Sequence, residues 1–504
     1  VSVVTLLVVV GPSKLWSNAQ QTYNKWMALT MILDKIQRFY VDEKDPDQLL
    51  ADAIDGMLSG LDPHSIYIPA DQAADYSRKY EGYYGVGLTF HVVDRKCTIT
   101  SVAKDGPAAL AGILIGDRIQ KIDGQVVSEI STDEMESLLG GNRNQYVSLD
   151  ILRPSQNLVM HFDLQKRKID IESISAACML DTITGYIRIT HFAESTPIEL
   201  DLAFAELNGV GMRRLLLDLR NNSGGDFEAG IAVADRFIEG GKLIVFTQGR
   251  APQTSGQFIA TSSVTFPQLP LVVLVNEKTA SDAEIITGAI QDWDRGIVVG
   301  RTTFGKALVQ TEYPFQDGSI LLLTTARYYT PLGRSIQNEN VLSDEGKSPA
   351  VAPKKFKTPK GRFVSDGGGI QPDFEIKKNA KSIPALLKKF YAEDNDYFLK
   401  FADEYIVTIP EETRPKKQND FLAAFQMDDV LWNRFSNWVS NQPALKINSG
   451  DLDSIRFIVA AELKIALAWR LWGDEGRNAA TAAVDEEVQK SLQYFEQADK
   501  ILLN

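Results

Sequence analysis

Histidine and cysteine, the side chains that most often carry catalysis and metal binding, are scarce in this sequence of 504 residues. It has four histidines, and none of them stands in a setting typical of a catalytic triad. The two cysteines, Cys97 and Cys178, lack the spacing of metal ligands and fall in different expected domains. A structural disulfide and a cysteine-based metal site are therefore not expected.

An excess of positive charge is also absent. The chain has 53 Lys and Arg residues against 66 Asp and Glu residues, which gives a formal net charge of −13. Because contacts with phosphate groups require a basic surface, this balance argues against a nucleic-acid-binding protein. Apolar residues make up 44% of the chain, as in ordinary globular proteins, and the length predicts several domains.

No long hydrophobic run is present. The apolar segment Val1–Val10 is too short to span a bilayer. Ser17-Asn18-Ala19 follows it and offers the small-x-small pattern of a signal-peptidase site. We therefore interpret residues 1–19 as the remnant of an export signal, which predicts a bacterial protein of the periplasm or cell envelope. A buried strand over Ser2–Val10 is the alternative.

The periodicity of apolar residues divides the rest of the chain into four regions. Residues 20–81 have helical spacing, and residues 82–168 have the pattern of strands and turns, with a hairpin signal at Asp123-Gly124. Residues 169–380 alternate apolar strands with helices, and residues 381–504 are helical again. The pattern predicts a multidomain α/β (α+β) protein.

Ser281 is the first candidate for chemistry. It follows the apolar run Leu271–Val275 and a short turn, and it opens an amphipathic helix. A strand, a tight turn and a helix expose a serine and direct backbone N–H groups to the same place, which nucleophilic catalysis requires. The alternative is a capping box, because Glu284 stands three residues after Ser281; the two roles are compatible.

Lys306 is the candidate base for that serine, and a serine–lysine pair needs no histidine. Its ammonium must lose a proton near neutral pH, which burial beside Gly305 favours. In an extended strand, Lys306, Leu308 and Gln310 would share one face, so that Gln310 could orient the lysine. The alternative is a solvated surface lysine.

Gly300–Lys306 matches the first seven positions of a phosphate-binding loop, but the eighth position is Ala307 where Ser or Thr is required. The segment Leu308–Tyr313 that follows has the pattern of a strand, whereas the loop should open a helix. We therefore do not expect nucleotide binding.

A second glycine turn comes earlier, where the strand Leu217–Leu219 runs into Gly224-Gly225. Exposed amides at such a turn can donate to an oxyanion. A simple turn without a catalytic role is the alternative.

Together these segments resemble the C-terminal processing peptidases, also called tail-specific proteases, over residues 20–376. The matching strings, in chain order, are Leu61–Ser65, Gly85–Leu88, Gly112–Asp117, Asp218–Gly225, Ala280–Ile285, Phe304–Lys306, Thr325–Arg334 and Gly369–Asp373. The spacing of 25 residues from Ser281 to Lys306 (306 − 281) also fits that family.

The resemblance implies a role for each candidate. Ser281 is the nucleophile, Lys306 the base and Gln310 the residue that positions the base. The oxyanion donors are the backbone amides of Gly224 or Gly225 and of Asp282.

The resemblance also implies the architecture. Residues 82–168 form a PDZ domain inserted ahead of a ClpP/crotonase-like peptidase core, with N-terminal helices and a C-terminal helical domain. A PDZ domain binds a free chain end by strand addition and holds its carboxylate in a nest of backbone amides, here formed by Gly85, Val86, Gly87 and Leu88. The expected partners are proteins or peptides with free C-termini, with no cofactor, metal or nucleotide. The C-terminal helices offer a surface through which protomers could pair.

Two residues depart from the family pattern. Asp282 stands where relatives usually carry a small residue, and a negative charge there could slow acyl transfer. Ala307 replaces the usual glycine after the lysine. Asp282 is also the one residue that favours the alternative function, a non-catalytic scaffold that binds peptides through its PDZ domain.

Overall fold

The structure is a computed structural model of the chain. It describes residues 12–73, 76, 82–93, 95–154, 156–261, 266, 269–339, 352–377, 384–391 and 396–503. Most of residues 1–19, on which the export signal was predicted, lie outside this part or show only the backbone of a helix. Among the described residues, no helix combines the length and the apolar character needed to cross a bilayer.

The chain falls into two compact units, and the smaller consists of residues 1–73 together with 310–324. It contains two helices, a short strand and the outer part of a hairpin: α1 (Pro12–Phe39), α2 (Pro46–Leu58), β1 (Ile66–Ile68), β17 (Leu308–Pro314) and β18 (Ile320–Tyr329). The N-cap of α2 is Asp45, whose side chain accepts from the N–H of Asp47. Strand β1 pairs antiparallel with β18, so the helical spacing expected for residues 20–81 does not extend through Ile66–Ile68.

In the larger unit, residues 83–169 form a module built on an antiparallel sheet of order β3-β4-β5-β7-β8, with β6 beside β5. Inward side chains alternate along β7, where Val147, Leu149 and Ile151 are buried in the module's own core. The predicted hairpin is confirmed, because Asp123 and Gly124 join β5 to β6 with positive φ at both residues. The elements are β2 (Tyr83–Gly85), β3 (Leu88–Val93), β4 (Lys96–Val102), α4 (Pro107–Leu110), β5 (Arg118–Ile122), β6 (Gln125–Val126), α5 (Thr132–Leu139), β7 (Tyr146–Arg153), β8 (Leu158–Gln165) and β9 (Arg167–Ile169).

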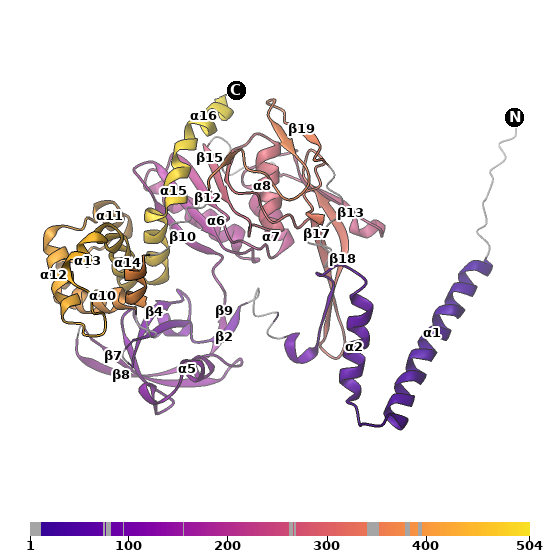
Figure 1. Ribbon diagram of the computed structural model, residues 1–504, viewed down its shortest axis with the longest axis horizontal. Coiled ribbons are helices and arrows are strands. Elements are labelled where there is room, and N and C mark those ends of the chain that lie inside the picture. The colour runs from indigo at the N-terminus through magenta and orange to yellow at the C-terminus, as the bar shows by residue number, and fades with distance from the viewer. Residues whose placement is uncertain are drawn as a thin grey trace. The chain divides into compact units, whose positions relative to one another are not determined.

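The second sheet of this unit has the order β10-β11-β12-β15-β16-β21, and all of its strands but β10 run parallel (Figure 1). Strand β15 is completely buried, as expected for a parallel strand covered on both faces. The strands and the helices between them are β10 (Ile174–Met179), β11 (Thr184–Ile189), α6 (Thr196–Gly209), β12 (Arg214–Asp218), α7 (Phe227–Asp235), β15 (Leu271–Val275), α8 (Asp282–Asp292), β16 (Ile297–Gly300) and β21 (Phe374–Glu375).

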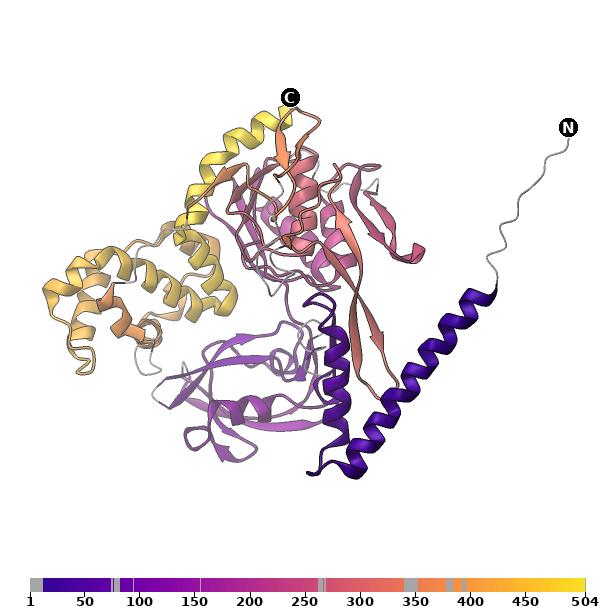
Figure 2. The same cartoon turned by 45° about the vertical axis from the view of Figure 1, so that its right-hand side comes forward.

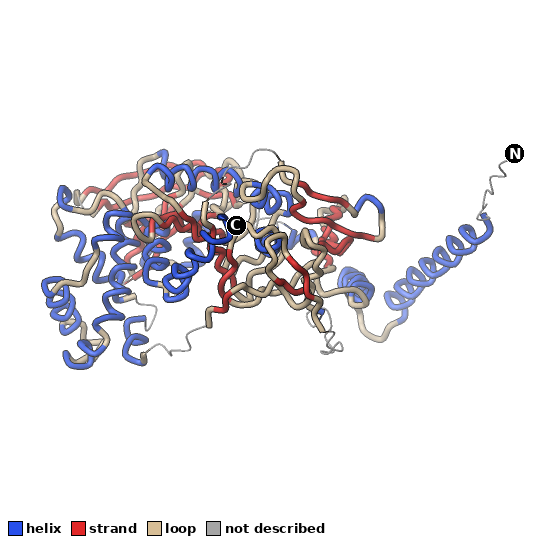
Figure 3. Tube along the Cα trace, turned by 90° about the horizontal axis from the view of Figure 1, so that it is seen from above, coloured by secondary structure: helices blue, strands red, loops and turns tan. Residues whose placement is uncertain are grey.

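Helices cover both faces of this sheet. Leu215 and Leu217 on β12 belong to a core shared with α6, α7 and α8. Leu216, which points to the other face, belongs to a core shared with the helices that follow residue 384. The sheet is therefore the middle of three layers. Figure 3 shows the helices of the chain in blue and its strands in red. The predicted α/β class is confirmed.

The C-terminal helices form a bundle and then run along the sheet, as the orange and yellow ribbon in Figure 2 shows. Trp432 is buried in this bundle. The bundle and the sheet share one core, whereas the boundary at residue 381 stays a prediction. The helices are α9 (Ala385–Lys388), α10 (Tyr397–Thr408), α11 (Gln418–Ala424), α12 (Asp429–Ser440), α13 (Ser449–Ser454), α14 (Arg456–Val484), α15 (Glu486–Ser491) and α16 (Phe495–Leu503).

The remaining strands of the larger unit form shorter ladders. Strand β13 pairs antiparallel with the last residues of β18 and with β14. Strand β2 pairs antiparallel with β9, and β19 and β20 form a further antiparallel pair. The bounds are β13 (Leu243–Gly249), β14 (Gly256–Ile259), β19 (Lys355–Lys357) and β20 (Phe363–Ser365).

Candidate active site

Ser281 lies in the turn between β15 and α8, at the amino-terminal end of the helix. Its backbone has φ +57° and ψ −121°, a strained conformation for a residue with a side chain. Such strain is concentrated at functional positions. The helix end places partial positive charge at the same point, which favours a developing anion. The predicted arrangement of strand, turn and helix around Ser281 is confirmed.

The carboxylate of Glu284 joins the Ser281 turn to the segment that carries Lys306. Its Oε2 accepts from the N–H of Ser281 at 3.0 Å and from the N–H of Lys306 at 2.9 Å. Its Oε1 accepts from the N–H of Gly305 at 2.8 Å and from the hydroxyl of Thr303 at 2.5 Å. Glu284 is completely buried, and burial raises its pKa to about 7 although the four hydrogen bonds favour the charged form.

A second buried group holds the same two residues. The hydroxyl of Tyr328 on β18 lies 3.0 Å from the carbonyl oxygen of Ser281 and 2.8 Å from that of Lys306. Its one proton is shared between these two acceptors. The backbones of Ser281 and Lys306 therefore have two partners in common, one that accepts from their N–H groups and one that donates to their carbonyls.

The glycine turn after β12 lies directly against Ser281. A Cβ placed on Gly224 would be 2.7 Å from the Cβ and 3.1 Å from the Oγ of Ser281, and φ at Gly224 is +98°. Only glycine fits this close approach. The N–H of Gly224 donates to Oδ1 of Asn222 at 2.8 Å. The carbonyl of Asn222 in turn accepts from the N–H of Ala280 at 2.8 Å, which fixes the two turns together.

The N–H of Gly225, the other predicted oxyanion donor of this turn, donates to the carboxylate of Asp282. The distance from N to Oδ2 is 2.8 Å. Burial raises the pKa of Asp282 to about 6, against the hydrogen bond from Gly225 and the positive charge of Lys306. The structure thus brings the glycine turn against Ser281 and places a side-chain carboxylate on the N–H of Gly225.

Lys306 is half-buried and precedes β17, which begins at Leu308. The argument that Lys306 and Gln310 share one face of a strand is therefore wrong in part, because regular alternation starts only at Leu308. The expected strand after the glycine-rich segment is confirmed, and this geometry differs from a phosphate-binding loop, which opens a helix.

Gln310 belongs to the smaller unit and takes part in a chain of hydrogen bonds there. Its Nε2 donates to Oγ1 of Thr324 at 3.1 Å, and that hydroxyl donates to Oδ1 of Asp62 at 3.0 Å. The hydroxyl of Ser65 donates to Oδ2 of Asp62 at 2.9 Å. Burial opposes ionisation of Asp62, but hydrogen bonds from Ser65, from the N–H of His64 and from Thr324 hold its pKa below the ordinary value. The Leu61–Ser65 string thus reaches Gln310 through Thr324.

The predicted carboxylate nest lies where β2 ends and β3 begins. Gly87 has φ +75°, and the carbonyls of Val86 and Gly87 accept from the N–H groups of Ala108 and Ala103 at 3.0 and 2.9 Å. Strand β3 ends the hydrogen-bonded order of its sheet in the described part of the chain. An edge strand beside this turn suits the addition of a peptide strand.

Comparisons with known proteins agree with this geometry. Residues 183–347 match the profile of peptidase family S41 and residues 98–153 that of the PDZ domain. A carboxy-terminal-processing protease of Bartonella bacilliformis is 33% identical over 343 residues, which cover 67% of this chain and 78% of that protein. The chain belongs to this family of carboxy-terminal processing proteases.

Two other relatives are similar to this peptidase. The carboxy-terminal processing protease CtpA of Bacillus subtilis is 32% identical over 343 residues, which cover 68% of this chain and 73% of that protein. The solved photosystem II D1 C-terminal processing protease is 28% identical with a TM-score of 0.37, covering 68% of this chain and 91% of that one. The family makes the chain a serine-type peptidase and favours the protease over the scaffold alternative.

Sequence reasoning missed two residues of the peptidase site. Glu284 was interpreted only as part of a capping box, and its bond to the N–H of Ser281 is indeed half of such a box. Its bonds to the segment of Lys306 could not be read from local spacing. Tyr328 lay within a string that matched the family, but no signal distinguished it from its neighbours.

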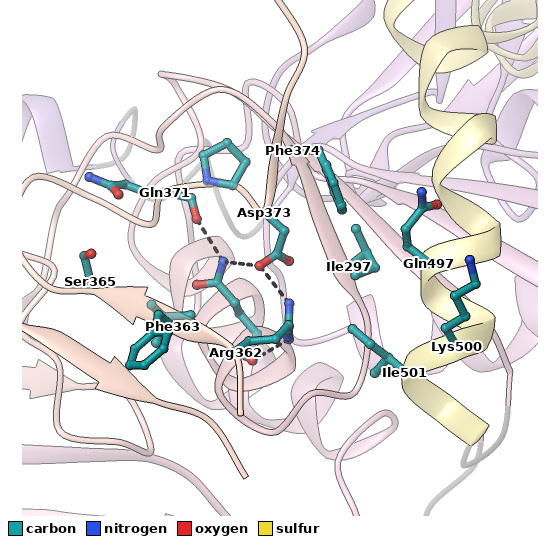
Figure 4. Close-up of a pocket in the computed structure, with 13 residues that line it drawn as sticks. Ile297, Arg362, Phe363, Ser365, Gln371, Asp373, Phe374, Gln497, Lys500 and Ile501 are labelled. Carbon is teal, nitrogen blue, oxygen red and sulfur yellow. Dashed lines mark hydrogen bonds and ion pairs between the residues drawn. The ribbon is translucent and has the colours of Figure 1, made fainter. Parts of the chain in front are cut away.

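A cavity of about 470 Å³ lies elsewhere in the larger unit, and Figure 4 shows its lining. Nε2 of Gln291 donates to the carbonyl of Gln371 at 2.8 Å and to Oδ1 of Asp373 at 3.3 Å, and Arg362 pairs with Asp373 at 2.7 Å. These groups already satisfy one another, and none of the predicted catalytic residues lines the cavity. We interpret the network as structural support for the segment before β21.

Proposed function

We propose that this peptidase is an ATP-independent endopeptidase that cuts exported proteins near their carboxyl ends, with Ser281 as nucleophile and Lys306 as base. One observation carries the assignment of this pair. Glu284 and Tyr328 each bind the backbone of both Ser281 and Lys306, so two buried polar groups hold these residues together. A surface lysine with no catalytic role would not need this support.

The reaction follows from these groups. Neutral Lys306 takes the hydroxyl proton of Ser281 while Oγ bonds to the scissile carbonyl carbon, and the carbonyl π electrons become the oxyanion. Backbone N–H groups of the glycine turn and of the α8 terminus stabilise that charge. Collapse breaks the C–N bond, and the leaving amine takes the proton from Lys306. Water then attacks the acyl ester, with Lys306 again as base, and releases Ser281.

Gln310 completes the proposed set. Asp62 is ionised and can only accept, so it fixes the Thr324 hydroxyl as a donor towards it. The Thr324 oxygen must then accept from Nε2 of Gln310, which leaves Oε1 of Gln310 as an acceptor for a further donor. The polarity of this chain supports the positioning role that the family resemblance implies.

Substitution of the two central residues tests the assignment. Ser281→Ala and Lys306→Met should each lower kcat for a peptide with a free apolar C-terminus by at least about 1,000-fold, with little change in thermal stability. Lys278→Met is the control, because Lys278 is an exposed lysine of the same turn and its loss should leave kcat unchanged. Retained cleavage by either active-site variant would contradict the mechanism.

Recognition of the chain end is tested with the same peptide in amidated form. Loss of the terminal carboxylate should raise KM and leave kcat almost unchanged, since the proposed nest of Gly85–Leu88 includes none of the residues proposed to break the bond. Equal KM values for the two peptides would contradict chain-end recognition.

Export to the periplasm or cell envelope and pairing of protomers through the C-terminal helices are further parts of the proposal. The first is supported by the composition of residues 1–19 and is tested by cell fractionation. The second is supported by exposed apolar side chains in the tail, such as Phe457 and Val430. Light scattering that gives the mass of one chain would contradict it.

A further inference from the structure

The side chain of Asp282 lies on the backbone groups that the proposed reaction requires for the oxyanion. Its Oδ2 accepts from the N–H of Gly225 at 2.8 Å. This N–H is one of the three amides predicted as oxyanion donors. Another, at Gly224, donates to Asn222.

A carboxylate oxygen and the oxyanion of a tetrahedral intermediate accept hydrogen bonds from such amides in the same way. Both are anionic oxygen acceptors that bind N–H donors at about 2.8 Å. They cannot occupy the same donors together. A substrate carbonyl that enters the site must therefore displace the Asp282 carboxylate before the donors can stabilise charge on it.

We infer that Asp282 is an internal competitor for the oxyanion hole, so that the resting enzyme holds its own carboxylate where the acyl oxygen of the substrate binds. This inference rests on the proposed catalytic role of Ser281 and deepens it. Asp282 would lower the rate of acylation and make it depend on how well a substrate removes the carboxylate from the amides.

The packing around Asp282 explains why the carboxylate reaches this place. The Cβ of Asp282 lies against Gly230 of α7, where an added Cβ would approach it to 2.7 Å. Glycine at that position leaves room for the longer side chain. Gly224 is also close, since a Cβ there would lie 3.1 Å from Oδ2 of Asp282.

The charges that face Asp282 explain why the contact is reversible. Lys306 attracts the carboxylate and Asp226, the N-cap of α7, repels it, while Tyr328 on β18 adds a neutral hydroxyl. Burial is the largest influence and disfavours the charged form. The contact is thus held by directed hydrogen bonds against an environment that penalises a carboxylate.

The competition depends on pH. Above pH 6 Asp282 is charged, binds the N–H of Gly225 as a strong acceptor and stabilises the ammonium form of Lys306. Both effects oppose attack by Ser281. Below that pH the carboxyl group of Asp282 is neutral and a weaker acceptor, so its hydrogen bond to the N–H of Gly225 is weaker.

Three substitutions separate occupancy from charge. Asp282→Asn removes the charge but keeps an oxygen that can accept from the N–H of Gly225, whereas Asp282→Ala and Asp282→Ser are too short to reach it. We expect kcat/KM at pH 8 to rise from wild type to asparagine and again to alanine or serine, the last by at least about tenfold. The ratio of alanine to wild type should fall towards the ratio of alanine to asparagine as the pH drops below 6.

A peptide boronic acid provides a readout of the donors themselves. Oγ of Ser281 bonds to boron, Lys306 takes the hydroxyl proton, and one boron-bound oxygen occupies the oxyanion donors. The alanine and serine variants should bind it at least about tenfold more tightly than wild type, and the asparagine variant should lie between. Glu228→Gln is the control, because it removes an exposed charge from the first turn of α7 and should change neither quantity.

Each other outcome has a definite meaning. Equal kcat/KM values for Asp282→Asn and Asp282→Ala would show that only the charge of Asp282 matters. They would overturn the inference that its side chain competes for the oxyanion donors. Lower activity in the alanine and serine variants, with thermal stability retained, would overturn the inference and give the carboxylate a positive role. Equal cleavage by wild type and all variants that is lost in Ser281→Ala would overturn the inference alone. Cleavage that survives in Ser281→Ala would overturn the proposed function and this inference with it.

Discussion

At the scale of single residues, the carboxylate of Glu284 accepts four hydrogen bonds from the turn of Ser281 and from residues 303–306. The donors are three backbone N–H groups and one hydroxyl. The backbone N–H groups are fixed in direction, and only the hydroxyl of Thr303 can rotate towards a different acceptor. A group with one accepting atom in this place would leave buried donors without partners, and each such donor costs about 1–3 kcal/mol.

Glu284→Gln is therefore expected to lower the free energy of unfolding by about 2–4 kcal/mol and kcat by at least tenfold. Glutamine has one accepting oxygen, and its NH₂ would face N–H donors. Denaturant unfolding and steady-state kinetics measure the two effects. Stability and kcat equal to those of wild type would contradict the role assigned to Glu284.

The same variant carries a prediction about pH. The folded pKa of about 7 lies above the ordinary 4.5, so ionisation of Glu284 works against the fold. The contribution of protonated Glu284 to the free energy of unfolding is fully present below pH 4.5 and is lost as the pH rises through 7. Glutamine does not titrate, so the variant should lose this part of the decline between pH 5 and pH 8.

At the scale of elements, strand β18 carries two functional contacts at different points along its length. Thr324 supports Gln310, and Tyr328 binds the carbonyls of Ser281 and Lys306. The two residues are four positions apart in an extended strand and so lie on one face of it. The strand thus presents both hydroxyl groups on one side.

Thr324→Val is expected to lower kcat by about tenfold and to leave KM almost unchanged. Valine keeps the branched shape that suits the strand, but it removes the acceptor of Gln310 and the donor to Asp62. Thr324→Ser retains the hydroxyl and should restore kcat. Loss of kcat in both variants, or in neither, would contradict a positioning role and is measured in the same assay.

At the scale of the whole larger unit, α15 binds two loops at the carboxyl ends of the central strands. Glu487 accepts from Nη1 of Arg220, which follows β12, at 3.0 Å and from Nη1 of Arg301, which follows β16, at 2.6 Å. Asp485, the N-cap of α15, also pairs with Arg220 at 3.1 Å. The last helices of the chain thus stabilise the segments that lead to the glycine turn and to Lys306.

Glu487→Gln should lower the free energy of unfolding by about 1–3 kcal/mol, because it removes the charge that pairs with one buried and one half-buried guanidinium group, those of Arg220 and Arg301. The effect on kcat should be smaller than that of Glu284→Gln, since Glu487 contacts neither Ser281 nor Lys306. Asp499→Asn, an exposed carboxylate on α16, is the control and should change neither value. An unfolding midpoint equal to that of wild type would contradict the prediction.

Much of the site could be predicted from local sequence because it lies at the ends of regular elements. The turn between β15 and α8, the start of α7 at Phe227 and the hairpin at Asp123-Gly124 each follow from apolar runs and turn residues. Strand β1 was missed because only three residues form it, and its pairing partner is more than 250 positions away. Local sequence patterns carry no information about a pairing partner so distant in the chain.

The sequence by itself determined the α/β class, the strand–turn–helix setting of Ser281 and the family, because these depend on periodicity and on residues close together in the chain. Only the tertiary structure decided that Glu284 and Tyr328 bind both Ser281 and Lys306, that Thr324 supports Gln310, and that Asp282 reaches the N–H of Gly225. Apart from the local contact of Glu284 with Ser281, each of these contacts joins residues from different elements, and the direction of a side chain across such a gap is set by packing.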